Sequence, residues 1–155
     1  MKRQRAFREA LSRFPTGVTL VATMDGRRAR AMTVNSFSSV SLEPALVLWS
    51  LGRDSARYAL FRHAPTFGIN VLAFDQVELS TRCARQDDLN GAGAQWIERE
   101  SGAVFVEGAI ARFDCRVTAV HEAGDHEIIV AQVLDFDTPR EAPALVFNRS
   151  AYGQI

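Results

Sequence analysis

Apolar and polar residues are distributed along the chain mainly in the short blocks and alternations that are typical of β-strands. The stretch Gly17–Thr23 is rich in β-branched residues, and Arg28–Val34 alternates polar with small apolar side chains. Asp25-Gly26 between them is a tight-turn signal, so these segments predict a β-hairpin. Further strands are predicted over Ala45–Trp49, Thr66–Leu72, Val104–Val120, Glu127–Phe136 and Ala144–Phe147, with turns at Glu43-Pro44 and Glu122–His126.

Helical periodicity is confined to three short segments. The first 14 residues carry apolar side chains at helical spacing, and Pro15 ends that pattern. A second helix is predicted from a cap at Asp54 or Ser55 to about His63, and a third from the capping-box-like Asp75–Glu78. The polar stretch Arg85–Gly93 after it holds two glycines and predicts a mobile loop.

Strands therefore dominate, and they do not alternate regularly with helices. This order favours a mainly β fold, in which an antiparallel sheet closes fully or partly into a barrel, over a doubly wound parallel sheet. The chain has 155 residues, of which 47% are apolar and 23% charged, which predicts one folded domain spanning 1–155.

Charge and cysteine usage restrict the class of protein further. The 18 Lys and Arg residues balance 18 Asp and Glu residues, so the formal net charge is zero. This balance argues against a broad basic surface for nucleic acid or an anionic membrane. No apolar run approaches the roughly 18 residues of a membrane span, and no signal-peptide pattern is present. Because Cys83 and Cys115 are far apart, no disulfide framework is indicated, and we expect a cytoplasmic protein.

Several familiar catalytic motifs are missing. Gly91-Ala92-Gly93 begins like a dinucleotide fingerprint, but Trp96 occupies the place of the third glycine. There is no phosphate-binding Walker loop and no nucleophile elbow. The three histidines lie in different predicted elements without the spacing of metal ligands, so we expect no metal site.

Two polar segments remain as candidates for chemistry. Thr33–Ser41 contains five hydroxyls and the Asn35 carboxamide, which can bind a phosphate or the polar edge of a heterocycle. The alternative is a solvated loop before Pro44. In Gly124-Asp125-His126, Asp125 could orient the imidazole or keep it protonated. The alternative there is a simple turn with a solvated histidine.

Five segments, taken in order, carry a resemblance to a known family. They are Phe7–Thr19; Ala31–Ser41 with Pro44; Phe67–Leu72 with Gln76; Gly124–His126; and Pro143–Phe147 with Tyr152. Over nearly the whole chain, this series resembles the short flavin reductases, the small reductase components of two-component flavin-dependent monooxygenases.

The resemblance implies an FMN-binding split β-barrel, antiparallel and Greek-key-like, with a few short α-helices. It further implies a homodimer that binds FMN or FAD in a groove near the subunit interface. NADH or NADPH would deliver hydride to the flavin, and the reduced flavin would leave for a separate monooxygenase.

The same resemblance assigns roles to individual residues. His126 would lie near the nicotinamide and orient it, as the candidate catalytic residue. The flavin edge would follow Ala31–Ser36, and the hydroxyls further along would approach the ribityl chain and the phosphate. The implied cofactor-binding residues are Ala31, Met32, Thr33, Val34, Asn35, Ser36, Ser39, Ser50, Leu51, Ser55, Ser80, Arg82 and Tyr152.

The sequence also departs from the family pattern. Val34 and Trp49 are larger than the usual residues at their positions, and Ala131 replaces a common glycine. Asp54 would repel a phosphate held by Ser55. Two other functions therefore stay open: an oxidoreductase that retains its flavin and acts directly on an organic substrate, and a non-catalytic flavin-binding module.

Overall fold

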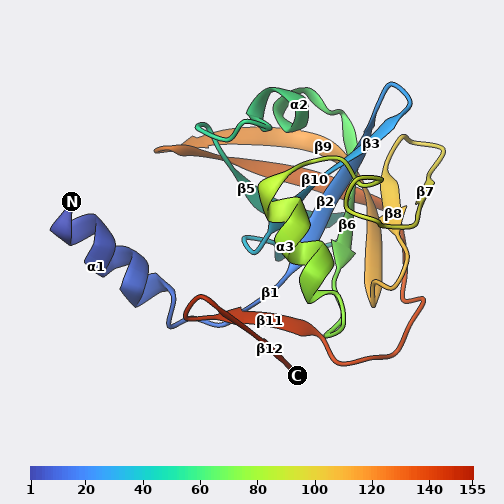
Figure 1. Cartoon of the computed structure of the whole chain (residues 1–155). Helices are drawn as coiled ribbons and strands as arrows, with labels where there is room; N and C mark the ends of the chain where they lie inside the picture. The colour runs from blue at the N-terminus through green and yellow to red at the C-terminus, as the bar shows by residue number, and fades with distance from the viewer.

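The computed structural model describes residues 1–155 and consists mainly of strands. A seven-stranded sheet of order β3-β2-β6-β9-β10-β5-β4 forms the body of the molecule (Figure 1). Its neighbours all run antiparallel. The strands of this sheet are β2 (Thr19–Asp25), β3 (Arg28–Val34), β4 (Ser38–Leu42), β5 (Ala45–Gly52), β6 (Thr66–Val71), β9 (Ala111–Ala123) and β10 (His126–Asp137).

Two small antiparallel sheets complete the strand content. The first has the order β1-β11-β12 and lies near both ends of the chain, and the second pairs β7 with β8. In the large sheet, β3 and β4 are the two edge strands, and they do not pair with each other. The mainly β, antiparallel architecture predicted from the sequence is confirmed. The strands of the small sheets are β1 (Thr16–Gly17), β7 (Trp96–Glu98), β8 (Val104–Val106), β11 (Leu145–Asn148) and β12 (Ala151–Gln154).

The predicted first hairpin is confirmed, while one long strand is not. β2 and β3 pair in register around a turn in which Gly26 has a φ of +62°. The expected strand Val104–Val120 is instead divided into β8 and β9, because Gly108 adopts a φ of +87° that an extended strand does not accommodate. The edge strand β4, the very short β7 and the terminal β12 were not predicted.

Three helices lie outside the sheets: α1 (Lys2–Leu11), α2 (Tyr58–His63) and α3 (Val77–Arg85). All three were predicted, but the predicted caps at α2 and α3 are wrong, because neither helix has a side-chain capping bond. Asp75 instead pairs with Arg140, at 2.7 Å between Oδ2 and Nη2. The side chain of Gln76 accepts a bond from the Ala73 N–H. At α3 the distant partner Arg140 has thus displaced Asp75 from the local capping pattern.

The interior divides into two apolar clusters on the two faces of β2. Leu20 and Ala22 pack toward α3 and the β7–β8 sheet, whereas Val21 packs with the large side chains of β5, β6 and α2. In the second cluster the Trp49 ring meets the Phe61 and Phe67 rings edge-on. This filled interior leaves polar ligands only the surface of the barrel.

The loop that follows α3 is anchored to the outer edge of β3. The Ala31 N–H donates to the Asp87 carbonyl, and the Leu89 N–H donates to the Ala29 carbonyl. The Leu89 side chain is fully buried. The stretch expected to be a mobile loop therefore covers one part of the β3 edge.

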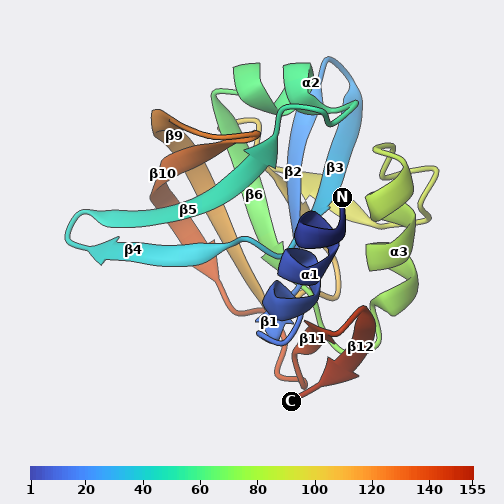
Figure 2. The ribbon, with the colours of Figure 1, turned by 90° about the vertical axis from the view of Figure 1, so that its left-hand side faces the viewer.

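Helix α1 projects from the body of the molecule (Figure 1), and Figure 2, which views it from that side, shows it near β1 and the β11–β12 hairpin. None of its residues is buried. None of the three helices is long and apolar enough to cross a membrane.

Candidate functional site

The outer edge of β3 becomes free at Thr33. Ala29 and Ala31 direct their backbone groups away from β2, toward the loop after α3. Because backbone direction alternates along a strand, Thr33 directs its N–H the same way, beyond the reach of that loop. This N–H has no hydrogen-bond partner in the chain. It is therefore available to an acceptor placed against the β3 edge.

Two serines link the end of β3 to β5. The Ser50 N–H donates to Ser36 Oγ at 2.9 Å, and the Ser36 hydroxyl returns a bond to the Ser50 carbonyl at 3.3 Å. These bonds replace the backbone pairing that β4 gives β5 only as far as Leu48. The hydroxyl-rich segment is therefore not a simple solvated loop, because Ser36 connects it to β5.

The loop after β5 holds a second connection to β3. Ser55 Oγ accepts the Arg57 N–H and lies 3.8 Å from the sulfur of Met32. The Arg57 guanidinium donates to the carbonyls of Ala31, Cys83 and Ala84. Sequence reasoning missed Arg57, and its position two residues after Ser55 was the only available signal. It joins β3 to the end of α3 and positions Ser55 close to Met32.

His126 begins β10 and faces the outside of the barrel. Its Nδ1 lies 2.7 Å from Asp125 Oδ1, and this hydrogen bond holds the pKa of Asp125 below its usual value. Nε2 lies only 3.5 Å from where a Cβ on Gly52 would stand, so the ring covers the end of β5. The Asp125 contact fixes the ring orientation, as the sequence reading allowed.

Ser36, Ser50 and His126 line a hollow of about 670 Å³, here called the outer groove, whereas Thr33 and Ser55 lie outside its lining. Its lining includes a buried hydroxyl, Thr16 Oγ1, that has no hydrogen-bond partner. The Asn35 carboxamide is exposed and likewise makes no bond within the chain. The outer groove is lined by Arg8, Leu11, Ser12, Phe14, Thr16, Asn35, Ser36, Ser50, Ala123, His126, Ile128, Phe147 and Arg149.

Three predicted binding residues turn their side chains into the core. Ala31 and Leu51 are fully buried, and Val34 is 5% exposed. The backbone N–H and carbonyl of Ala31 are already bonded to Asp87 and Arg57. These residues shape the strands behind the groove, and contact from their side chains to a ligand would require the core to open.

Ser80 and Tyr152 form a separate polar link. Ser80 is fully buried, and its Oγ lies 2.9 Å from the Tyr152 hydroxyl. The Ser80 carbonyl accepts a bond from the Thr33 hydroxyl at 2.6 Å. The pair therefore ties α3 to β3 and β12, which fixes the strand edge from which the Thr33 N–H projects.

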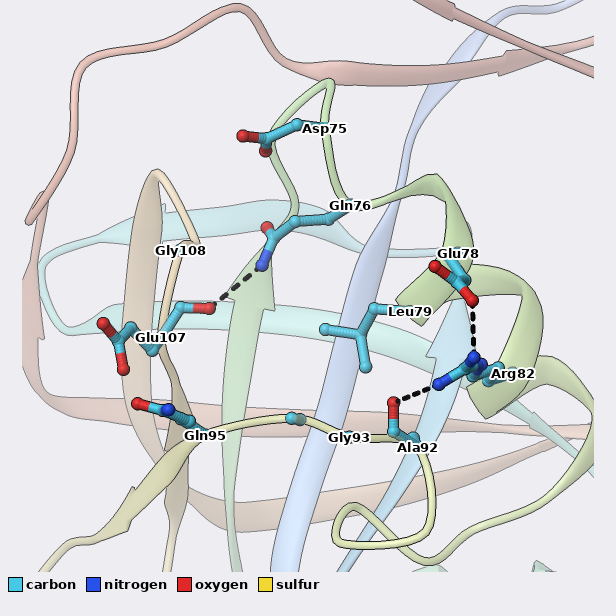
Figure 3. Close-up of a pocket in the computed structure, with 11 residues that line it drawn as sticks. Asp75, Gln76, Glu78, Leu79, Arg82, Ala92, Gly93, Gln95, Glu107 and Gly108 are labelled. Carbon is cyan, nitrogen blue, oxygen red and sulfur yellow. Dashed lines mark hydrogen bonds and ion pairs between the residues drawn. The ribbon is translucent and has the colours of Figure 1, made fainter.

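Arg82 and Ser39 lie apart from the groove. Figure 3 shows Arg82 bonded to Glu78 and to the Ala92 carbonyl in a different hollow, of about 410 Å³. Asp75 and Glu107 line this hollow as well, so carboxylates surround Arg82, one of the implied cofactor-binding residues. Ser39 is exposed on β4 next to an irregularity in the β4–β5 pairing. The structure does not bring either residue together with the Ser36–Ser50 link.

The two cysteines are buried and unpaired, and they are not part of the groove. Burial raises the pKa of the Cys83 thiol to about 11 and that of Cys115 to about 12. Both thiols are therefore protonated at neutral pH. No three histidine, cysteine or carboxylate side chains come together as metal ligands.

The free groups at the groove suit a flat, polar heterocycle with a phosphorylated tail. Thr33 offers a backbone donor at the strand edge, and Asn35 offers both a donor and an acceptor. Phe14 and Phe147 supply apolar surface in the same hollow. Such a combination of apolar surface with a few placed polar groups is typical of cofactor and nucleotide sites.

Comparisons with known proteins agree with this arrangement. Residues 11–155 match the family described as flavin reductase like domain. The FMN reductase (NADH) SmoA of Agrobacterium fabrum is 44% identical over 97% of this chain and 86% of its own length. The flavin-dependent monooxygenase reductase subunit HsaB of Rhodococcus jostii is 34% identical over 97% of this chain and 77% of its own length.

A solved structure gives the same result for the fold. The Streptomyces globisporus NADH:FAD oxidoreductase SgcE6, in complex with NAD and FAD fragments, superposes with a TM-score of 0.89 at 32% identity. The alignment covers 99% of this chain and 93% of that one. The predicted split-barrel fold is therefore confirmed.

Proposed function

The chain belongs to the flavin reductase like domain family, and from this premise we propose that it transfers hydride from NADH or NADPH to free FMN or FAD. The reduced flavin then leaves for a separate monooxygenase. The observation that carries the proposal is the free Thr33 N–H at the β3 edge, next to the Ser36–Ser50 link and the outer groove with His126. We propose that residues 1–155 work as one domain.

Each part of the groove has a distinct task in this proposal. The isoalloxazine edge would lie along Thr33–Ser36, where the Thr33 N–H would donate to a ring acceptor and Asn35 would supply a side-chain bond. When bound, the flavin supplies the hydride acceptor, its N5 atom, and the nicotinamide C4 supplies the hydride. A fixed N–H donor beside the ring stabilises negative charge without a proton donor from the protein. The protein therefore acts mainly by holding two rings in register.

Ser50 and Ser55 are the hydroxyls best placed for the flavin tail among the predicted residues. Ser50 lines the groove, and Ser55 lies beside Met32 in the loop that Arg57 fixes. The Arg57 guanidinium next to Ser55 is already bonded to three carbonyls, so hydroxyls and backbone groups would hold the tail there, which suits a flavin that must dissociate. Asp54 in the same loop further weakens phosphate binding by repulsion.

Enzymatic assay of the purified chain tests this function. NADH oxidation at 340 nm should require added FMN, FAD or riboflavin, and dialysis should remove most flavin from the protein. Dialysis-resistant flavin with turnover of an organic substrate would instead identify a flavin-retaining oxidoreductase. Flavin binding without NADH or NADPH oxidation would identify a non-catalytic module.

We propose that His126 orients the nicotinamide, with Asp125 fixing the ring. The His126→Ala variant should raise the KM for NADH and lower kcat, together about tenfold in kcat/KM, since one positioned contact is lost. Asp125→Asn should have a smaller effect of the same kind, because the ring keeps its position over Gly52. Unchanged kcat and KM in His126→Ala would contradict the assignment.

We propose that the chain forms a homodimer through α1 and its neighbours. Phe7 is 64% exposed on α1 and, unlike Leu11 and Phe14, does not line the outer groove, so its apolar surface has no partner in one subunit. A second copy related by a two-fold axis would cover it. Light scattering at micromolar concentration should give twice the subunit mass, and Phe7→Glu should shift the protein toward the monomer.

The reducing cytoplasm is the compartment we propose, which the two buried, unpaired thiols support. NADH is the donor named for SmoA and SgcE6, and comparing NADH with NADPH in the same assay determines which donor this chain prefers. Transfer of reduced flavin to a monooxygenase is tested by adding an oxygenase of a two-component system and measuring product formation.

A further inference from the structure

A cluster of four arginines lies beside the outer groove. Arg5, Arg8, Arg13 and Arg149 line a hollow of about 420 Å³, here called the arginine pocket. Glu9 is the only carboxylate in its lining, so the lining has a surplus of three positive charges. None of these four arginines forms an ion pair, although many arginines elsewhere in the chain pair with carboxylates.

The structure holds this cluster in place from two sides. Arg149 and Ser150 form the two-residue turn between β11 and β12 with φ values of 50° and 61°. Positive φ at residues other than glycine is unfavourable, so the turn places Arg149 at a cost in free energy. The Arg149 N–H also donates to the Ser12 carbonyl at the end of α1, at 2.9 Å. The C-terminal end of α1 offsets only about half a charge, which leaves most of the surplus uncompensated.

The arginine pocket and the outer groove lie next to each other. Arg8, Ser12 and Arg149 line both. Arg8 also lowers the pKa of Asp125, although less than the hydrogen bond from His126 does, so its guanidinium lies within electrostatic reach of the Asp125–His126 pair. A molecule with its nicotinamide at His126 would therefore extend toward several unpaired guanidinium groups.

We propose that the arginine pocket binds the phosphate groups of the nicotinamide dinucleotide. This inference rests on the function proposed above and adds a binding site for the donor. Guanidinium groups bind phosphate oxygens through paired, charge-assisted hydrogen bonds. The Ser150 hydroxyl is a further donor in the same hollow. The flavin phosphate shares this chemistry, so the experiment must distinguish the two nucleotides.

The test combines two substitutions with two hydride donors, and it uses riboflavin as the acceptor because riboflavin carries no phosphate. The double variant Arg8→Ala/Arg149→Ala should raise the KM for NADH about tenfold, since two charge-assisted contacts are lost. Reduced nicotinamide riboside has no phosphate, so wild type and variant should oxidise it with the same kcat/KM. The riboside also shows whether the variant keeps its fold and hydride-transfer site.

Two single variants provide matched controls. Arg3→Ala removes a charge from the same helix outside the arginine pocket, and it should leave the KM for NADH unchanged. Glu9→Gln removes the one negative charge of the lining, so it should lower the KM for NADH about twofold. The effect of Glu9→Gln should disappear at high salt because exposed charges are screened.

Each other outcome overturns the proposal in a recognisable way. An unchanged KM for NADH in the double variant would show that the arginine pocket does not bind the donor. In a parallel assay with FMN as the acceptor, a raised KM for FMN with an unchanged KM for NADH would assign the arginine pocket to the flavin phosphate. Equal loss with NADH and with the riboside would show a general structural effect. If the wild type oxidised neither donor with riboflavin, the proposed function itself would fail.

Discussion

The polar groups inside the barrel and those of the outer groove differ in how their hydrogen bonds are satisfied. Asn70 is fully buried, and its side chain donates to the carbonyls of Leu20 and Val104 and accepts the Val106 N–H. In the groove, Asn35 has no such partner. The same carboxamide thus stabilises the fold in one place and is left free for a ligand in the other. We expect substitutions in the interior to reduce stability and substitutions in the groove to reduce binding.

Among substitutions in the interior, Gly68→Ala should reduce stability most. A Cβ at this position would stand 2.1 Å from the Val104 carbonyl oxygen, and the backbone there cannot move without separating β6 from its neighbours. We expect a loss of about 3 kcal/mol or more in the free energy of unfolding. Urea denaturation checks this value. Gly153→Ala is the control, because a Cβ there meets nothing within 4 Å.

Asn70→Ala should be the next largest effect. It removes three hydrogen bonds and leaves buried backbone groups without partners, which costs about 3 kcal/mol in total. Urea denaturation should show the loss, whereas the KM for FMN of the remaining folded protein should stay close to the wild-type value. A destabilisation below about 1 kcal/mol would contradict the role assigned to Asn70.

Ser36→Ala should show the opposite pattern. The variant loses the link to Ser50 at the surface, so stability should fall by only about 1 kcal/mol. The KM for FMN should rise about fivefold, because the groove wall between β3 and β5 loses its connection. Ser38→Ala is the matched control, since Ser38 is exposed and bonds only to its neighbour Ser39. Equal effects of the two substitutions would contradict the account.

The smallest effect should come from Asp87, in the loop that covers the β3 edge between the interior and the groove. Its contribution to stability should depend on pH. The hydrogen bond from Arg30 lowers the pKa of Asp87 below its ordinary value of 3.8. A lowered pKa contributes stability above pH 3.8, and this stability is lost as the pH falls toward the lower value of the folded state. Asp87→Asn should therefore cost about 1 kcal/mol at pH 5 and less at pH 3. Urea denaturation at the two pH values measures the difference, and an equal cost at both would contradict it.

The sequence predicted those parts of the molecule that depend on local patterns. The β2–β3 hairpin followed from Asp25-Gly26 and the flanking residues, and the groove segment followed from the hydroxyls around Asn35. The caps were predicted wrongly, because Asp75 has a better partner in Arg140, which lies far away in the sequence. Arg57 and the cluster of Arg8 with Arg149 were missed for the same reason, because their partners are also far away in the sequence. Residues far apart in the chain become a site only when the fold brings them together.

The free N–H of Thr33 is the central claim, and one pair of variants tests it directly. Thr33→Pro removes this N–H, yet the β2–β3 ladder should survive, because Thr33 does not donate to β2 and proline is tolerated at a strand edge. Thr33→Val keeps the N–H and removes only the hydroxyl that bonds to Ser80. Quenching of FMN fluorescence during titration with each folded variant measures binding. The account predicts that Thr33→Pro weakens FMN binding about tenfold relative to Thr33→Val. Equal affinities of the two variants would contradict it.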